Sequence, residues 1–438
     1  MTTSIRRAAA FAGVGTLALV GSVLVAGVAA LFAAIGALAL VVDEGVVFDL
    51  FARPSDRSEG RLRGLAAFSF ATAGLAMLVI VVDLPTRVFA AAVCLLVYGN
   101  LVEQVARSWN NTAITATAGF TVGGFVAAFA AQIVVLSVND MPIDSMIPIL
   151  IFLSASGALL AGLLRSVLFE RDDPLVMFSV ALLLWLFADL TVTVTPTEVA
   201  IAIAVTVGFG YLSWMLDAAS VTGMLTGVLL ALLTIVLGGY PWFAVLISFF
   251  ALGALSTKFR YEQKRENGVA EANEGARGGG NVLGNAAVAL FAVLAFAASD
   301  RLPVASTVFL FAFAGSIATA MSDTLSSEIG GVFDKPRLIT TLERVEPGTD
   351  GGVTWQGELA GALGAIVVAV IAVVLFGSIG TLGGVVIALA GVGGMTVDSL
   401  LGATIEGEKI GNQSVNFLAT LAGALLGAGL SLVVGLPA

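Results

Sequence analysis

Histidine is absent from this chain of 438 residues, and cysteine occurs only once, as Cys94. Without histidine, the chain cannot use His-based acid–base catalysis, His-ligated metals or a Ser-His-Asp triad. A single cysteine cannot form an internal disulfide or a Cys-rich metal site. Any chemistry must therefore use carboxylates, Lys, Arg, hydroxyls, amides, backbone groups or a hard cation.

Charge is also scarce, because only 11% of the residues are charged, whereas soluble domains carry about 25%. The net charge of −10 argues against a nucleic-acid partner. Hydrophobic residues make up 58% of the chain, and the mean hydropathy is +1.04. Apolar stretches of about 20 residues recur from end to end. This pattern predicts an all-α fold, a polytopic transmembrane helical bundle in contact with a lipid bilayer.

The apolar runs predict about 15 membrane spans. We expect them near residues 8–25, 28–42, 65–83, 88–102, 113–137, 146–164, 174–194, 198–214, 219–238, 242–257, 282–298, 304–320, 358–376, 380–398 and 415–434. The first apolar run is read as a two-helix hairpin with a cytoplasmic N-terminus. Eighteen of the 20 basic residues then fall on the cytoplasmic side, with only Arg87 and Arg301 outside. This positive-inside bias predicts a multi-pass protein of the cell membrane with its C-terminus outside.

The character of the sequence changes near residue 215. Residues 1–214 consist of spans joined by short loops, and their role is unknown. Residues 215–438 carry three polar segments at 258–281, 321–356 and 398–414, all predicted to be cytoplasmic. Long polar loops in a compact protein are usually functional or disordered. Since the three segments share one predicted side, we expect one composite site there.

The first polar segment combines basic residues with a glycine run. Lys258 stands at a membrane exit, and Arg277 precedes Gly278, Gly279 and Gly280 at the start of a span. Glycines that enter a helix let backbone N–H groups approach an anion, and Asn281 would lie beside them. The alternative is a flexible loop that carries positive-inside charges.

The second polar segment begins with acidic and hydroxyl residues at a span end. If the helix continues, Glu328 lies about 140° round the helix from Asp323, with Thr324 between them in the chain. Carboxylates and hydroxyls at such an end suit a Mg²⁺ ion that carries nucleotide phosphates. The alternative is a helix terminus exposed to water.

Two further features complete the predicted site. The first is a turn rich in Gly, Thr and Asp, which forms an anion nest or an ordinary turn. The second is the start of the third segment, where a carboxylate and an amide lie at span ends, although the amide could instead join two helices. The residues concerned are Thr340, Thr341, Thr349, Gly351 and Gly352 in the turn, and Asp398 and Asn416 in the third segment.

These segments resemble a known family of membrane proteins. The family is domain-of-unknown-function family 92, which includes the phytyl-phosphate kinase of chloroplasts and the animal transmembrane protein 19. One departure is visible, since GARGGGN stands where a more basic Arg-Arg-Gly and a Gln are expected. The stretches that carry the resemblance are TGMLTGVLLALLTIVLGGYPWFAVLISFFALGALSTKFRYEQK (222–264), GARGGGNVLGNA (275–286), SDTLSSEIG (322–330), PRLITTLERVEPGTDGGVTWQGELAGALGA (336–365), VDSLLGATIEGE (397–408) and NQSVNFLATLAGALLG (412–427).

The resemblance implies a phosphotransferase. It would convert an isoprenoid monophosphate, such as phytyl or geranylgeranyl phosphate, into the diphosphate. The resemblance favours CTP as the nucleoside triphosphate donor, with Mg²⁺ as cofactor. The implied catalytic and metal-binding residues are Lys258, Asp323, Glu328 and Asp398, of which the three carboxylates would hold the metal. The implied nucleotide-binding residues are Arg277, Gly279, Asn281, Thr324, Thr340, Thr341, Thr349, Gly351, Gly352 and Asn416.

Two other functions stay open at this point. A CTP-dependent cytidylyltransferase that makes a CDP-lipid would use the same residue types. A membrane transporter is favoured by the number of spans and by Asp189, which is a lone carboxylate in a predicted span. The sequence leaves isoprenoid length, donor nucleotide and oligomeric state open.

Overall fold

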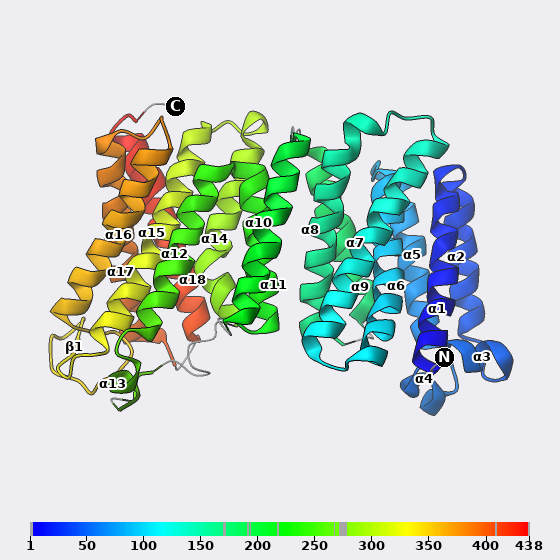
Figure 1. Cartoon of the computed structure of the whole chain (residues 1–438), viewed down its shortest axis with the longest axis horizontal. Helices are drawn as coiled ribbons and strands as arrows, with labels where there is room; N and C mark the ends of the chain where they lie inside the picture. Colours follow the sequence, from blue (N-terminus) through cyan, green and yellow to red (C-terminus); the bar gives the residue numbers. More distant parts are fainter. Residues whose placement is uncertain are drawn as a thin grey trace. The chain divides into compact units, whose positions relative to one another are not determined.

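The computed structural model describes residues 3–436, except 170–171, 191, 193, 217–218, 267, 271–277 and 408–409. Its contacts divide the chain into two compact units, Met1–Ile201 and Ala202–Ala438. The helices of the first unit are α1 (Thr3–Thr16), η1 (Leu17–Ser22), α2 (Val25–Ala39), α3 (Gly45–Phe51), α4 (Pro54–Glu59), α5 (Arg63–Val81), α6 (Thr86–Trp109), α7 (Ala113–Val138), η2 (Asp144–Met146), α8 (Ile147–Val167) and α9 (Asp173–Asp189) (Figure 1).

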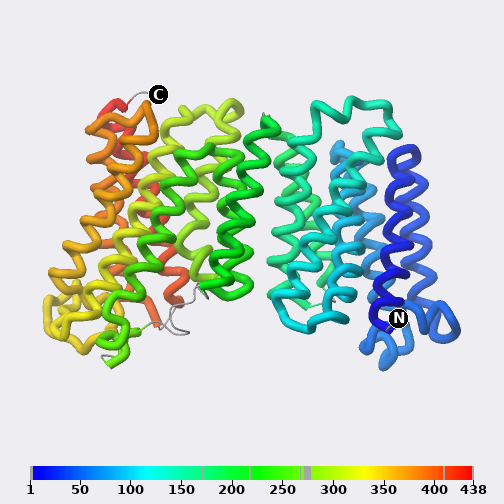
Figure 2. The backbone as a smooth tube through the Cα atoms, in the orientation of Figure 1, coloured from blue at the N-terminus to red at the C-terminus, as the bar shows by residue number. Residues whose placement is uncertain are grey.

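Helix α10 (Pro196–Met215) crosses the boundary between the units. The remaining elements are α11 (Val221–Gly238), α12 (Tyr240–Lys258), α13 (Tyr261–Glu266), α14 (Gly279–Ala297), η5 (Ser299–Arg301), α15 (Ser306–Gly330), β1 (Arg337–Leu338), β2 (Gly352–Val353), α16 (Trp355–Leu375), α17 (Thr381–Ile405) and α18 (Asn412–Val433). The chain path in Figure 2 shows long helices that run side by side within each unit.

The prediction of an all-α membrane protein is confirmed. In the described part of the chain, twelve helices are long and apolar enough to cross a membrane. Helices are the expected form, because a bilayer offers no water to satisfy backbone N–H and C=O groups. The other three predicted spans fall on shorter helices, namely α1 with η1, α2 and α9.

Charged side chains tie helices of the first unit together. Arg165 of α8 pairs with Glu103 of α6 at 3.0 Å and with Asp173 of α9. Arg53 also reaches Asp173, at 2.8 Å. These side chains are at most 13% exposed, and each buried charge has an opposite partner, as burial requires.

Helix α15 is the centre of the second unit and contacts α12, α14, α16, α17 and α18. Glycines let its neighbours approach closely, since a Cβ on Gly423 would lie 1.9 Å from Thr319 Oγ1 and one on Gly394 would lie 2.1 Å from it. Small residues at helix contacts are the usual means of close packing in membranes. The tight packing positions the ends of α15, α17 and α18 relative to one another.

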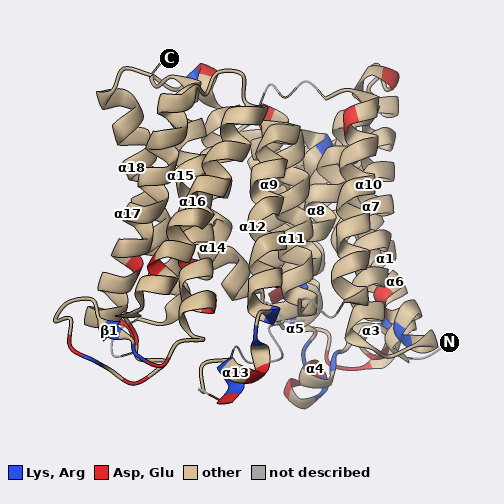
Figure 3. Cartoon of the chain, turned by 60° about the vertical axis from the view of Figure 1, so that its left-hand side comes forward, with Lys and Arg blue, Asp and Glu red and all other residues tan. Residues whose placement is uncertain are grey.

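The polar elements of the second unit lie at one end of its helices. Figure 3 shows α13 and the segment around β1 there, with the ribbon colours of Lys, Arg, Asp and Glu positions concentrated in them. Strands β1 and β2 pair antiparallel, with Arg337 opposite Val353 and Leu338 opposite Gly352. Helices α15 and α17 extend beyond the predicted span ends at 320 and 398, so that Asp323 and Asp398 lie inside continuous helices.

Candidate functional site

A cavity of about 450 Å³ lies at this polar end of the second unit. We call it the polar cavity. Its walls come from α14, α15, α17 and α18 and from the loop and hairpin segments 268–270 and 330–354. Five carboxylates and four amides line it: Asp323, Glu328, Asp350, Asp398, Glu406, Asn281, Asn285, Asn412 and Asn416.

Two carboxylates from different helices meet in the polar cavity. The carboxyl groups of Asp398 of α17 and Asp323 of α15 lie close enough to interact directly. Asp398 Oδ1 is buried and has no hydrogen-bond partner among the described residues. Two carboxylates this close require a shared proton or a cation between them. The pair, together with amides and hydroxyls, fits a hard cation such as Mg²⁺, which binds through one or two carboxylates and keeps several waters.

Glu328 has a different environment from the one predicted. Its Oε2 pairs with Lys264 Nζ, and its Oε1 accepts a hydrogen bond of 2.8 Å from Thr257 Oγ1. Lys264, which is 2% exposed, also donates to the backbone carbonyls of Ser256 at 3.2 Å and Thr257 at 2.7 Å. The charge of Glu328 is therefore neutralised within the protein.

The predicted three-carboxylate metal set is thus not assembled. Among the described residues, no group of three or more Asp, Glu, Cys or His side chains is placed to hold a metal ion. The reason is helical geometry: Glu328 follows Asp323 by five residues, which places it on another side of α15. Asp323 therefore meets α17, whereas Glu328 meets α12 and α13.

A second acidic pair lines the polar cavity beyond the helix ends. Glu406 directly follows α17, and Asp350 lies in the turn before β2. Burial raises the pKa of Glu406 above its usual 4.5, and the nearby Asp350 carboxylate raises it further, while a hydrogen bond with Asn412 opposes the shift. This pair adds to the negative charge of the site.

The glycine turn is held against α17. Gly351 has a φ of +72°, and a Cβ there would lie 2.5 Å from the backbone N of Ala403 and 2.6 Å from the carbonyl O of Ser399. Only glycine fits both the left-handed backbone and this contact. Thr349, Gly351 and Gly352 therefore line the polar cavity.

The other predicted residues divide into two groups. Asn281, Thr324 and Asn416 line the polar cavity. Five others were predicted, and the four described ones do not line it. Lys258, Thr340 and Thr341 are exposed, and Gly279 is buried with its N–H 3.4 Å from Thr222 Oγ1, while Arg277 lies outside the described residues. Phosphate contact by Lys258 was expected because it stands at a membrane exit, but its side chain ends outside the cavity. No Lys or Arg lines the polar cavity in the described part of the chain.

Sequence reasoning missed Lys264, Asp350 and Glu406 as components of this site. Lys264 lies in the charged run YEQKRE, where nothing in the sequence separates it from Arg265 or Lys258. Asp350 could have been suspected from its place in the Gly/Thr/Asp turn. Only the tertiary contacts show which of these charges is buried.

An apolar cavity of about 280 Å³ lies among α10, α11, α12 and α14. Its walls include Phe209, Gly227, Val228, Phe250 and Val282. On α14, Asn281 lines the polar cavity and the next residue, Val282, lines the apolar cavity. The start of α14 is therefore shared by a polar and an apolar cavity.

Comparison with known proteins identifies the family. Residues 204–424 match the family described as Integral membrane protein DUF92. The chain is 40% identical over 197 residues to the uncharacterized membrane protein MJ0933 of Methanocaldococcus jannaschii, which covers 43% of this chain and 76% of that protein. This chain belongs to the DUF92 family.

Plant and cyanobacterial DUF92 relatives match the same part of the chain. It is 30% identical over 219 residues to the chloroplastic protein VTE6 of Arabidopsis thaliana, over 48% of this chain and 65% of that protein. It is 32% identical over 200 residues to the uncharacterized membrane protein sll0875 of Synechocystis. This match covers 44% of this chain and 74% of that protein. No solved structure matches the chain. The resemblance predicted from the motifs is thereby confirmed.

All the residues that line the polar cavity fall within the DUF92 match at 204–424. The first unit lies almost entirely outside it. Asp189, which motivated the transporter alternative, is the last residue of α9 and is exposed, so it does not lie in the middle of a span. The polar cavity of this DUF92 protein is therefore formed by described residues of the second unit.

Proposed function

We propose that this DUF92 protein is a membrane-embedded kinase that converts an isoprenoid monophosphate, such as phytyl or geranylgeranyl phosphate, into the diphosphate. The donor would be a nucleoside triphosphate, with CTP as the first candidate and Mg²⁺ as the metal. The observation that carries the proposal is the Asp323–Asp398 pair, which lies in the polar cavity at the polar end of the second unit's helices.

The adjoining apolar cavity supports a lipid acceptor. A polyisoprenoid tail is apolar, and the cavity among α10, α11, α12 and α14 has almost purely apolar walls. Because Asn281 and Val282 are consecutive, the phosphate of such a lipid could lie in one cavity and its tail in the other. This arrangement matches the amphipathic shape of an isoprenoid phosphate.

The proposed reaction requires positioning rather than acid–base catalysis. An anionic oxygen of the acceptor phosphate attacks the γ-phosphorus of the donor and forms a new P–O bond. The bond from the γ-phosphorus to the β–γ bridging oxygen breaks, and the nucleoside diphosphate leaves. No general base is needed, which suits a chain without histidine.

Asp323 and Asp398 would hold Mg²⁺, and the amides of Asn281 and Asn416 would donate to phosphate oxygens. When bound, Mg²⁺ would neutralise part of the charge on the phosphates. The Lys264–Glu328 pair would hold α13 against α15 and shape the wall of the cavity. The glycine turn at 348–352 would bring backbone N–H groups to the same space.

The test is a turnover assay with the purified full chain in neutral detergent micelles. Mg²⁺, labelled CTP or ATP, and geranylgeranyl or phytyl monophosphate would be supplied, and product mass would be measured. We expect isoprenoid diphosphate, and its absence with every donor would refute the kinase proposal. A product that has gained CMP would instead establish a cytidylyltransferase, which the same carboxylate pair could serve.

We also propose that the polar cavity faces the cytoplasm of a cell whose plasma membrane holds the protein. The predicted positive-inside distribution of Lys and Arg supports this orientation. A reporter fused after Ala438 should be active outside the cytoplasm. Cytoplasmic activity of that reporter would reverse the orientation.

A further inference from the structure

A second cavity, of about 520 Å³, adjoins the polar cavity. Phe333, Val353 and Thr354 line both cavities, so the two share a wall. The second cavity is otherwise lined by Asp334, Lys335, Arg337, Arg344, Trp355 and Gln356. We call it the basic pocket, because three cations and one carboxylate give its lining a formal charge of +2.

Within the described parts of the chain, no ion pair neutralises the cations of the basic pocket. Lys335, Arg337 and Arg344 are exposed, and none of them forms a salt bridge with another described residue. The guanidinium of Arg337 donates through Nη1 to the Leu342 carbonyl at 2.6 Å. This hydrogen bond orients Arg337 without removing its charge.

Two of these cations face each other across the hairpin. Arg337 and Arg344 form an antiparallel β-bridge, and Val353 lies opposite Arg337 on the other side. Residues directly opposite in such a pair have Cβ atoms about 5 Å apart, and like charges there are unfavourable. An anionic ligand between the two guanidinium groups would offset that repulsion. Arg is also the side chain best suited to bind phosphate oxygens in a bidentate manner.

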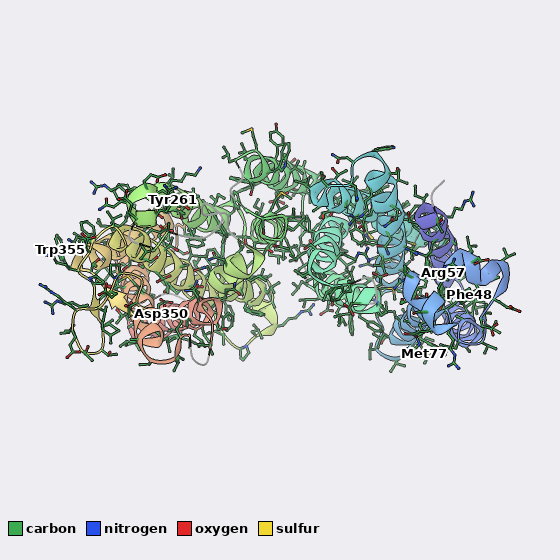
Figure 4. The ribbon with its side chains drawn as sticks, turned by 90° about the horizontal axis from the view of Figure 1, so that it is seen from below. Phe48, Arg57, Met77, Tyr261, Asp350 and Trp355 are labelled. Atoms are coloured by element: carbon green, nitrogen blue, oxygen red, sulfur yellow. The ribbon has the colours of Figure 1, made fainter. Side chains whose placement is uncertain are left out.

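An aromatic side chain completes the basic pocket. Trp355, the first residue of α16, is 72% exposed and lines the pocket beside Gln356. Figure 4, which views the chain from this end, shows Trp355 at the outer edge and Asp350 farther in, over the helix ends. An exposed indole can stack on a nucleobase. The pocket thus combines an aromatic face with phosphate-binding cations next to the acidic cavity.

We propose that the basic pocket binds the donor nucleoside triphosphate. Arg337, Arg344 and Lys335 hold its phosphates and Trp355 stacks on its base, while the terminal phosphate extends past the shared wall into the polar cavity. This inference rests on the proposed kinase function. It supplies the positive charge that the described lining of the polar cavity lacks.

The test measures equilibrium binding of labelled CTP and ATP to the full chain in nanodiscs of neutral phosphatidylcholine, with no acceptor present. We expect the double variant Arg337→Gln/Arg344→Gln to weaken binding about tenfold or more, and Trp355→Leu to weaken it about fivefold or more. The matched controls are Arg260→Gln/Arg265→Gln, two exposed arginines at the same end of the unit, and Trp109→Leu, an indole that is 84% exposed at the end of α6. These controls should retain the affinity of the unchanged protein.

A second arm separates the nucleotide from other sources of phosphate. The same variants would be tested for binding to anionic phosphatidylglycerol vesicles and to inorganic phosphate. Loss of vesicle binding with unchanged CTP affinity would overturn the inference and assign the patch to the membrane surface. Displacement of the labelled nucleotide by unlabelled CTP at a much lower concentration than by inorganic phosphate would support the inference.

Turnover keeps this inference distinct from the proposed function. Suppose that Arg337→Gln/Arg344→Gln loses CTP binding but the unchanged protein forms no diphosphate. The nucleotide pocket then stands and the kinase proposal fails. If diphosphate forms and the Arg337→Gln/Arg344→Gln variant keeps the KM for CTP of the unchanged protein, the kinase stands and the pocket is refuted. If the variant has a higher KM for CTP and the thermal stability of the unchanged protein, both the kinase proposal and the nucleotide pocket are supported.

Discussion

Lys264 and Glu328 form an ion pair in which the lysine is 2% exposed, although the lysine belongs to a six-residue helix outside the spans. Lys264 also donates to two carbonyls at the end of α12, and Glu328 accepts from Thr257. The pair therefore joins α12, α13 and α15 beside the polar cavity. It also neutralises the carboxylate of Glu328, which was predicted from the sequence as a metal ligand.

Replacing one member of this pair should destabilise the protein. Lys264→Ala leaves the Glu328 charge buried without its partner, which costs about 3–5 kcal/mol. Thermal unfolding in detergent would show a clear decrease in Tm. The matched control is Arg265→Ala, which removes an exposed pair with Glu262 and should change stability by less than about 1 kcal/mol. Equal effects of the two substitutions would contradict the structural role of Lys264.

Asp398→Asn should abolish the proposed metal site. We expect diphosphate formation to fall by about a hundredfold or more, the size of effect that follows loss of a preorganised electrostatic group. The protection of the protein by Mg²⁺ against thermal unfolding should disappear as well. Asp300→Asn, an exposed carboxylate in η5, is the control and should behave like the unchanged protein. Retention of Mg²⁺ protection in Asp398→Asn would exclude Asp398 as a ligand.

The pH dependence of stability should change in Glu406→Gln. Burial and Asp350 raise the pKa of Glu406 in the folded state, so the folded protein binds this proton more tightly than the unfolded chain does. Ionisation of Glu406 therefore lowers the free energy of unfolding as the pH rises from the usual pKa of 4.5 through the raised value. Removing the carboxyl group abolishes that loss.

The measurement is Tm between pH 4 and about 8 in the presence of a chelator. The Tm of Glu406→Gln relative to the unchanged protein should increase with pH across this window. Glu343→Gln, an exposed glutamate of the hairpin, is the control and should give a constant difference. A decreasing difference for Glu406→Gln would show that the carboxylate is stabilised in the folded state.

Gly351→Ala should detach the glycine turn from α17. The left-handed backbone costs alanine about 1–2 kcal/mol, and the new Cβ would also collide with the backbone of Ala403 and Ser399. Gly60→Ala is the control, because Gly60 has a similar φ of +65° but open space around its Cβ position. We expect Gly351→Ala to reduce turnover much more than Gly60→Ala does. Similar turnover in both variants would mean that the turn has no part in the reaction.

Gly227→Leu should fill the apolar cavity. A Cβ at Gly227 meets no atom within 4 Å, so the added side chain occupies free space rather than straining the helix. The KM for geranylgeranyl phosphate should rise by about tenfold or more, while that for a short isopentenyl phosphate should change little, as expected for lost tail contacts. Gly429→Leu, on an exposed part of α18 with equal free space, is the control. Unchanged chain-length preference in Gly227→Leu would place the tail elsewhere.

The sequence by itself determined the class of fold and the polar segments that form the candidate site. Apolar runs of membrane-spanning length require helices, because a bilayer satisfies no backbone hydrogen bonds. The motifs around Asp323, Gly351 and Asp398 indicated both the DUF92 family and the polar segments that form the cavity. Local pattern was sufficient for these features, since each depends on residues that are close in the chain.

Only the tertiary structure decided which of these residues meet. Asp323 and Asp398 are far apart in sequence, and they pair because glycines let α15 and α17 pack closely. The direction of each side chain on α15 separated Glu328 from that pair and gave it to Lys264. The hairpin turned Thr340 and Thr341 away from the cavity and brought Asp350 into it. Which of several similar charged side chains form a pair depends on the packing of segments that are far apart in the sequence. No local sequence pattern encodes that packing.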